Sequence, residues 1–159
     1  MSRKFEYVNR VTSTGYEMKN PGFDLPKRAT KHSIAYDFYS PEDFVVEPHS
    51  KYMLWTGVKA QFLDDEALLL NVRSSMGKKN IMLSNTQAWI ESDYYNNKDN
   101  EGHIFVCLQN ESDKEVVIKK GDRFVQGIFM SYLITDDDCA TDTRNGGIGS
   151  TNEGDDNNE

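Results

Sequence analysis

The stretch "KKGDRFVQGIFMSYLI", residues 119–134, decides the fold class of this chain. It opens with a Gly-Asp pair that is typical of a tight turn and continues as an apolar run rich in strand-forming residues. Gln126 is a polar residue among apolar ones, and Asp122 in the turn could pair with an arginine. The stretch therefore predicts a turn followed by a core strand.

Similar short runs recur along the chain. Apolar or alternating runs include "DFVVE" (43–47), "KYMLWTG" (51–57), "ALLLNV" (67–72) and "HIFVCLQN" (103–110), with turn formers such as "PHS", "LDDE" and "NESDK" between them. Many short strands at regular spacing favour a sandwich or barrel over alternating βαβ units. Only "SSMGKKN" (74–80) could hold a short helical turn. We expect an all-β fold with one short helix.

Length and composition predict one domain with two flanking segments. The 159 residues are 37% hydrophobic and 28% charged, which is typical of a chain with a proper core. Residues 1–24 are polar and interrupted by Gly and Pro, so we expect an N-terminal extension with an added strand and a loop. Residues 25–134 carry the strand pattern and form the domain. Residues 135–159 have few apolar residues and are expected to be a mobile tail.

The charge is placed unevenly. From residue 135 onward there are eight acidic residues and one base, Arg144, so the tail carries nearly all of the formal net charge of −8. The body is close to neutral, which disfavours nucleic-acid polymers as partners, because proteins that bind them present basic faces to the phosphates. A small phosphorylated ligand remains possible where a few bases converge.

Several other classes of protein are disfavoured. No apolar run approaches the roughly 20 residues that span a bilayer, and "MSRKFEYVNR" lacks the apolar core of a signal peptide. We therefore expect a cytoplasmic protein with no membrane partner. The two cysteines do not suggest a disulfide framework, and the three histidines show no spacing typical of a zinc site.

Two segments suit phosphate groups. "RNGGIGST" (144–151) has a backbone that can wrap closely around a ligand, with Arg144 and Ser150 among its donors. "NVRSSMG" (71–77) ends a strand with the guanidinium of Arg73 and two hydroxyls. Taken singly, the first segment could be a flexible linker and the second a strand end with a surface arginine.

The order of these segments carries a resemblance. Over roughly residues 25–152 the chain resembles the homotrimeric dUTPase family, the deoxyuridine triphosphate pyrophosphatases, in five motifs: "SIAYDFYS" (33–40), "VRSSM" (72–76), the stretch from Asn85 to Tyr94, "GDRFVQGIF" (121–129) and "RNGGIGST" (144–151). The insertion "YYNNKDNEG" (94–102) looks like the branch found in Gram-positive bacteria and their phages.

The resemblance implies a β jelly-roll subunit, three of which build three active sites at their interfaces. It implies hydrolysis of dUTP to dUMP and pyrophosphate, with Mg²⁺ bound mainly by phosphate oxygens and water rather than by protein ligands. The location implied is the cytoplasm of a bacterium or of a phage-infected cell. The fifth motif would close over the site as an ordered lid from a neighbouring subunit, with Arg144 on the γ-phosphate.

The resemblance also assigns residues. Glu91 stands at the position of the aspartate that activates water, Asn85 would read uracil and Tyr94 would stack on the deoxyribose. Asp37 and Asp122 would support the site. The substrate-binding residues implied are Arg73, Ser74, Ser75, Asn85, Ala88, Ile90, Tyr94, Gln126, Arg144, Ile148, Gly149 and Ser150.

The third motif departs from the family pattern Gly-Val-Ile-Asp-x-x-Tyr, since this chain reads Ala88, Trp89, Ile90 and Glu91 at the first four positions. One more methylene moves the carboxylate about 1.5 Å, and errors near 1 Å can cost roughly 10²-fold in rate. Two interpretations stay open. The chain is a working dUTPase with a shifted, slower site, or it binds or sequesters a nucleotide, a nucleotide-like signal or a protein partner without hydrolysing it.

Overall fold

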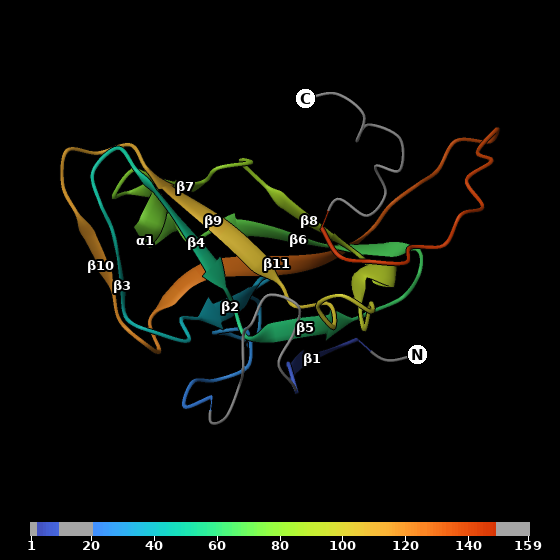
Figure 1. Ribbon diagram of the computed structural model, residues 1–159, viewed down its shortest axis with the longest axis horizontal. Helices are drawn as coiled ribbons and strands as arrows, with labels where there is room; N and C mark the ends of the chain where they lie inside the picture. The colour runs from blue at the N-terminus through green and yellow to red at the C-terminus, as the bar shows by residue number, and fades with distance from the viewer. Residues whose placement is uncertain (1–2, 10–20, 149–159) are drawn as a thin grey trace.

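The computed structural model describes residues 3–9 and 21–148, and in these two ranges the chain is a β protein (Figure 1). The expected all-β fold is confirmed. The strands are β1 (Lys4–Tyr7), β2 (Tyr36–Tyr39), β3 (Phe44–Val46), β4 (Lys51–Trp55), β5 (Val58–Gln61), β6 (Glu66–Val72), β7 (Ile81–Leu83), β8 (Ala88–Glu91), β9 (Phe105–Asn110), β10 (Val116–Ile118) and β11 (Arg123–Ser131). The expected short helix is α1 (Ser74–Gly77). A second helical turn, the 3₁₀ turn η1 (Ser92–Tyr94), was not expected.

The described residues form four sheets, of which two are larger than a pair of strands. A four-stranded sheet has the order β2-β11-β6-β8, and a three-stranded sheet has the order β4-β9-β7 and crosses over it (Figure 1). Side chains alternate along β6, with Leu68 and Leu70 fully buried and Leu69 half-buried on the outer face. They join Phe124 of β11 and Leu108 of β9 in one apolar cluster. The long strand predicted from residues 123–134 is therefore a central strand, β11, which ends at Ser131.

The N-terminal extension contributes a strand to the domain. As expected for an added strand, β1 pairs antiparallel with β5, with Phe5 opposite Ala60. Val8, just beyond β1, is fully buried. The described part of the extension is thus packed on the body rather than separate from it.

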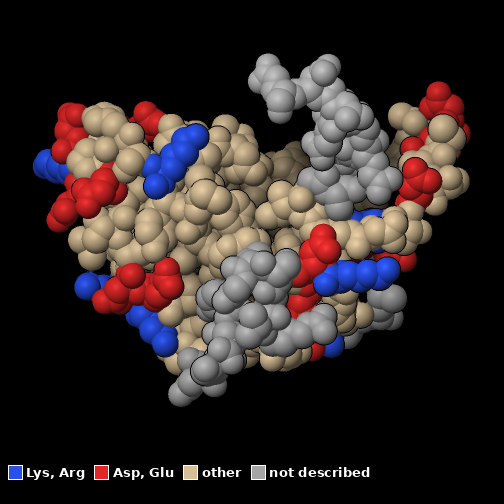
Figure 2. All heavy atoms as spheres, in the orientation of Figure 1, with Lys and Arg blue, Asp and Glu red and all other residues tan. Residues whose placement is uncertain are grey.

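The C-terminal end of the described chain differs from the rest of the protein in its charge and in its path. After β11 the described chain, residues 132–148, forms no strand and first projects away from the sheets (Figure 1). Acidic side chains gather on this projection, whereas Lys and Arg are interspersed with Asp and Glu elsewhere on the visible face (Figure 2). Within the described ranges no helix has the length and apolar character that crossing a membrane requires.

Candidate functional site

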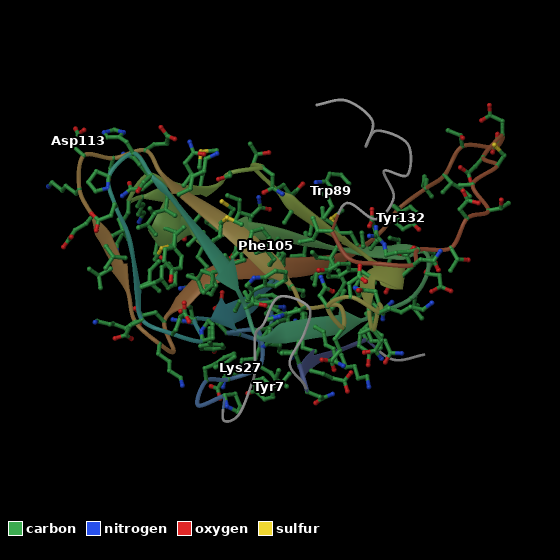
Figure 3. The ribbon with its side chains drawn as sticks, in the orientation of Figure 1. Tyr7, Lys27, Trp89, Phe105, Asp113 and Tyr132 are labelled. Carbon is green, nitrogen blue, oxygen red and sulfur yellow. The ribbon has the colours of Figure 1, made fainter. Side chains whose placement is uncertain are left out.

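A cavity of about 330 Å³ lies where β8, η1 and the segment 144–148 meet. Figure 3 labels two of its lining side chains, Trp89 from β8 and Phe105 from β9. The full lining is Asn85, Ala88, Trp89, Ile90, Glu91, Tyr94, Phe105, Arg144 and Ile148. The structure therefore brings seven residues that the sequence assigned to one site into one cavity: Asn85, Ala88, Ile90, Glu91, Tyr94, Arg144 and Ile148. Gly149 and Ser150, also assigned to it, lie outside the described residues.

A tight turn places Asn85 at the cavity. Thr86 has a positive φ of 63°, and its N–H donates to the carbonyl of Leu83 at 2.8 Å. The side chain of Asn71 on β6 holds this turn from outside, because its amide donates to the Thr86 carbonyl at 3.2 Å. The same side chain accepts from the Gln87 amide at 2.9 Å. The turn is thus fixed to the four-stranded sheet by side chains as well as by its own backbone.

Glu91, the expected water-activating carboxylate, forms an ion pair with Arg144. The guanidinium also reaches Asp93, with Nε 3.0 Å from Oδ1, and lies over the ring of Tyr94 at 5.8 Å from its centroid. The Arg144 side chain is only 9% exposed, while that of Glu91 is 63% exposed. Arg144 is therefore enclosed between two carboxylates and an aromatic ring. An anionic ligand in the cavity would compete with these carboxylates for the guanidinium.

Tyr94 is held in place by two hydrogen bonds of its hydroxyl. Its hydroxyl donates to the carbonyl of His103 at 2.8 Å and accepts from the amide of Asn100 at 2.7 Å. Burial raises the pKa of Tyr94 above its usual value, so the phenol stays neutral. A ring with both hydroxyl contacts satisfied is a rigid wall for a ligand.

The expected phosphate ligands form a second group on the same sheet. A cavity of about 430 Å³ is lined by Ala29, Ser33, Ile34, Ala35, Asp37, Leu69, Asn71, Arg73, Gln126 and Ile128. Arg73 Nε lies 2.8 Å from Asp37 Oδ1, and Arg123 Nη1 lies 3.2 Å from Asp37 Oδ2. Ser74 and Ser75 follow Arg73 in α1 and are exposed. Asp37 therefore holds one of the predicted phosphate-binding side chains in place.

The pairing with an arginine that Asp122 could make is not formed among the described residues. Its carboxylate accepts the N–H of Lys119 at 2.9 Å and so closes the turn before β11. Among the described residues the arginine contacts of this region go to Asp37 instead. Asp122 stabilises a turn, because the turn places it next to the free backbone N–H of Lys119 and away from Arg73.

The residues around Glu91 and the residues around Arg73 are far apart on one face of the four-stranded sheet. Glu91 lies opposite Ala67 on β6, and Gln126 lies opposite both Asp37 and Asn71. Ala67 and Arg73 are six residues apart, which is about 20 Å at about 3.4 Å per residue. Between the groups runs an apolar row across three strands, formed by Ile128, Leu69 and Trp89. Within one chain, Glu91 therefore lies far from Arg73 and Gln126, whereas Arg144, the ligand expected on the γ-phosphate, lies beside it.

Sequence reasoning did not assign Phe105, Asn71 or Arg123 to the site. Phe105 starts an apolar strand and reads as a core residue, yet it lines the cavity, and its ring also contacts that of Trp55 at a centroid distance of 5.1 Å. Asn71 immediately precedes the "VRSSM" motif, and its polar side chain in an otherwise apolar strand was the available clue. The described ranges contain no group of three or more His, Cys, Asp or Glu side chains arranged to hold a metal ion.

Comparison with known proteins gives one family. The profile of the dUTPase family matches residues 22–152. A curated relative, the deoxyuridine 5′-triphosphate nucleotidohydrolase of Lactococcus lactis subsp. lactis (strain IL1403), is 45% identical over 152 residues, which cover 94% of this chain and 97% of that protein. The corresponding protein of Histophilus somni (strain 2336) is 35% identical over 136 residues, covering 80% of this chain and 86% of that one.

Comparison with solved structures gives the same family. The crystal structure of dUTPase from Streptococcus mutans matches with a TM-score of 0.71 and 39% identity, covering 83% of this chain and 98% of that one. A dUTPase from the Staphylococcus aureus phage phi11, in which a species-specific insert was visualised, matches with a TM-score of 0.68 and 15% identity, covering 89% and 97%. At that identity the phage protein supports the fold alone, and the expected dUTPase fold is confirmed.

Proposed function

This chain belongs to the dUTPase family, and from that premise we propose that it hydrolyses dUTP to dUMP and pyrophosphate. The observation that carries the proposal is the meeting of Asn85, Glu91, Tyr94 and Arg144 around one cavity. A base-reading amide, a carboxylate, an aromatic wall and a guanidinium are the groups that a deoxyuridine nucleotide requires. The 45% identity to the Lactococcus enzyme over nearly the whole chain supports the same reaction.

Glu91 is the proposed general base. A water oxygen attacks the α-phosphorus, the bond from that phosphorus to the bridging oxygen breaks, and pyrophosphate leaves while Glu91 takes the proton of the water. The carboxylate can do so only when Arg144 does not hold it. The triphosphate of the substrate would displace Glu91 from Arg144, because its oxygens offer the guanidinium a more highly charged partner than one carboxylate does.

Arg73, Ser74, Ser75 and Gln126 are the proposed phosphate ligands. Arg73 suits the role because Asp37 fixes its Nε and leaves other guanidinium N–H groups to reach an anion. The two hydroxyls are exposed at the start of α1, where they can turn toward a bound ligand. Gln126 lines the same cavity from β11.

Mg²⁺ is proposed to arrive with the substrate. Asp37, the carboxylate next to Arg73, is engaged by two arginines and is 8% exposed, so it is poorly placed to take a cation as well. This donor set fits an ion held by phosphate oxygens and water, which is the usual mode for Mg²⁺ with nucleotides. Bound there, the ion would neutralise charge on the phosphate oxygens.

A homotrimer with shared sites is the proposed assembly. The separation of about 20 Å between Glu91 and Arg73 along the sheet supports a site that is shared between chains. The apolar row that separates them is an exposed surface of the kind that subunit interfaces cover, since Trp89 alone is 67% exposed. Packing three such faces around an axis would cover the row and bring Glu91 of one copy to Arg73 of another.

The test is pyrophosphate release by the purified protein with Mg²⁺ from dUTP, with dCTP, dTTP and UTP as controls. We expect release from dUTP well above release from the three controls. The competing function is nucleotide binding without hydrolysis. The ion pair with Arg144 favours it, because that pair occupies the carboxylate of Glu91. Tight dUTP binding with no pyrophosphate release would replace the proposed function with that one.

A further inference from the structure

Residues 84–87 form the turn that joins β7 of the three-stranded sheet to β8 of the four-stranded sheet. The turn places Asn85 in the lining of the cavity beside β8. At its start, the N–H of Ser84 donates to the carbonyl of Cys107 at 2.9 Å, so the backbone of β9 holds this end. The position of Asn85 then depends on what holds the other end of the turn.

Asn71 holds that other end through its side chain. The regular pairing of β6 with β8 runs from Ala67 to Leu70 on β6, and Asn71 is the next residue. Its Nδ2 donates to the carbonyl of Thr86 at 3.2 Å, and its Oδ1 accepts from Gln87 Nε2 at 2.9 Å. One side chain therefore continues the work of the backbone ladder at the point where the chain leaves the sheet.

The backbone at Thr86 makes this support necessary. Its φ of 63° lies in the left-handed region, which a β-branched residue rarely adopts. Such a conformation persists only where its surroundings hold it. Within the turn, the N–H of Thr86 donates to the carbonyl of Leu83 at 2.8 Å, and its hydroxyl donates to the carbonyl of Asn85 at 2.6 Å. The hydrogen bond from Asn71 fixes the strained residue to a neighbouring strand as well.

Asn71 also borders the cavity of the expected phosphate ligands. It lines that cavity together with Arg73, and it lies opposite Gln126 of β11. Among the described residues, however, both hydrogen bonds of the Asn71 side chain go to the turn. The contacts therefore assign Asn71 to the turn that carries Asn85 rather than to the phosphate groups.

We propose that Asn71 is a positioning residue that determines base selectivity, because it sets the place of Asn85 in the cavity. Its ligand, a deoxyuridine nucleotide, rests on the proposed function, but the support of the turn does not. Uracil offers an acceptor, a donor and an acceptor along its pairing edge, whereas cytosine offers a donor and two acceptors. Hydrogen-bonding groups distinguish these patterns only when they are held in place, and a misplacement of about 1 Å can cost roughly 10²-fold.

Steady-state kinetics give the first test. Asn71→Ala should raise the KM for dUTP about tenfold and leave kcat within about twofold, because the lost hydrogen bonds position the base and not the attacking water. The ratio of kcat/KM for dUTP to that for dCTP should fall about tenfold. A role in stability alone would lower the active fraction for both substrates and leave this ratio unchanged.

Two further variants sharpen this test. Asn71→Asp keeps the acceptor for Gln87 but turns an oxygen toward the Thr86 carbonyl, so it should lose selectivity as Asn71→Ala does. Gln109→Ala removes an amide that is also half-buried, on β9 of the other sheet, and should match wild type. A ratio in Asn71→Ala equal to that of Gln109→Ala would overturn the proposal.

Binding of the two halves of the substrate separates the turn from the phosphate cavity. In isothermal titration, deoxyuridine should bind Asn71→Ala about tenfold more weakly than it binds wild type. Tripolyphosphate with Mg²⁺ should bind the two proteins equally. Equal weakening of both probes would assign Asn71 to the phosphate cavity and overturn the proposal.

Amide exchange in D₂O tests the support of the turn without any nucleotide. The N–H groups of Thr86 and Gln87 donate within the turn at 2.8 and 2.7 Å, so their slow exchange reports a closed turn. Asn71→Ala should speed this exchange about tenfold relative to wild type and to Gln109→Ala. Equal exchange in the three proteins would overturn the proposal even if dUTP is hydrolysed. Faster exchange in Asn71→Ala, with no hydrolysis by wild type, would support the role of Asn71 in the turn and contradict the proposed function alone.

Discussion

At the scale of single residues, the ion pair of Arg144 and Glu91 is a structural contact that, in the proposed reaction, the substrate has to break. The guanidinium also contacts Asp93, the ring of Tyr94 and the carbonyl of Gly147. The family resemblance placed Glu91 and Tyr94 in one site, in the third motif, where they lie three residues apart. Nothing local indicated that Arg144 meets them, because that contact spans more than 50 residues, and only the family resemblance suggested it.

Arg73→Ala should weaken binding of dUTP far more than binding of deoxyuridine. The substitution removes charge-assisted hydrogen bonds to phosphate, which correspond to about 10–100-fold in affinity. Isothermal titration with Mg²⁺-dUTP and with deoxyuridine measures the difference. Lys51→Ala, an exposed cation on β4, is the matched control for loss of charge. Equal weakening of both ligands would remove Arg73 from the phosphate site.

His103 predicts a dependence of stability on pH. Burial lowers its pKa to about 4 from the ordinary value of 6.5, and its neutral Nε2 accepts the N–H of Gly57 at 2.8 Å. Because the folded pKa lies below the unfolded one, this stability is fully present above pH 6.5 and is lost as the pH falls toward 4. Urea unfolding of wild type and His103→Gln should therefore converge over that window by about 3 kcal/mol at most. A constant difference would contradict the assignment.

At the scale of elements, apolar runs and turn-forming residues were sufficient to predict the main strands from the sequence. β6 and β11 were visible as a short and a long apolar run, and the turn before β11 was visible from its Gly-Asp pair. The 3₁₀ turn η1 and the ordered conformation of residues 95–102 were not visible, because polar residues there are buried through hydrogen bonds to one another. Asn97 and Asn100, at 7% and 4% exposure, look in sequence like surface loop residues.

Gly127 in the middle of β11 should resist substitution. A Cβ there would lie 2.7 Å from Leu70 Cδ2 and 3.0 Å from Leu68 Cδ1, in the packed core between the sheets. We expect Gly127→Ala to cost about 1–3 kcal/mol in free energy of unfolding, measured in urea. Gly77→Ala is the control, because a Cβ at Gly77 meets nothing within 4 Å. Equal stability of the two variants would show that the core at Gly127 is loosely packed.

At the scale of the whole molecule, the residues assigned to the site line two separate cavities within one chain. The outer face of the four-stranded sheet has Gln126 and Asn71 in one row, Ile128, Leu69 and Trp89 in the next, and Glu91 in the third. The family resemblance of the sequence assigned Gln126 and Glu91 to one site, and this assignment stays a prediction. Their separation could not be predicted from the sequence, since it depends on the register of three strands.

The assembly is measured by light scattering. Three chains of 18.2 kDa give about 55 kDa for the closed cyclic trimer that we expect. Leu69→Asp places a charge in the centre of the apolar row and should shift the protein toward monomers and abolish dUTP hydrolysis together. Lys51→Asp, on the other sheet, should do neither. A wild-type monomer that hydrolyses dUTP would contradict shared sites.

The measurement that most directly tests the central claim is steady-state dUTP hydrolysis by wild type, Glu91→Asp and Glu91→Gln at one Mg²⁺ concentration. If Glu91 activates the water, Glu91→Asp should raise kcat by restoring the shorter reach, and Glu91→Gln should nearly abolish kcat while leaving dUTP affinity largely intact. Turnover in Glu91→Gln equal to that of wild type would contradict the water-activating role of Glu91.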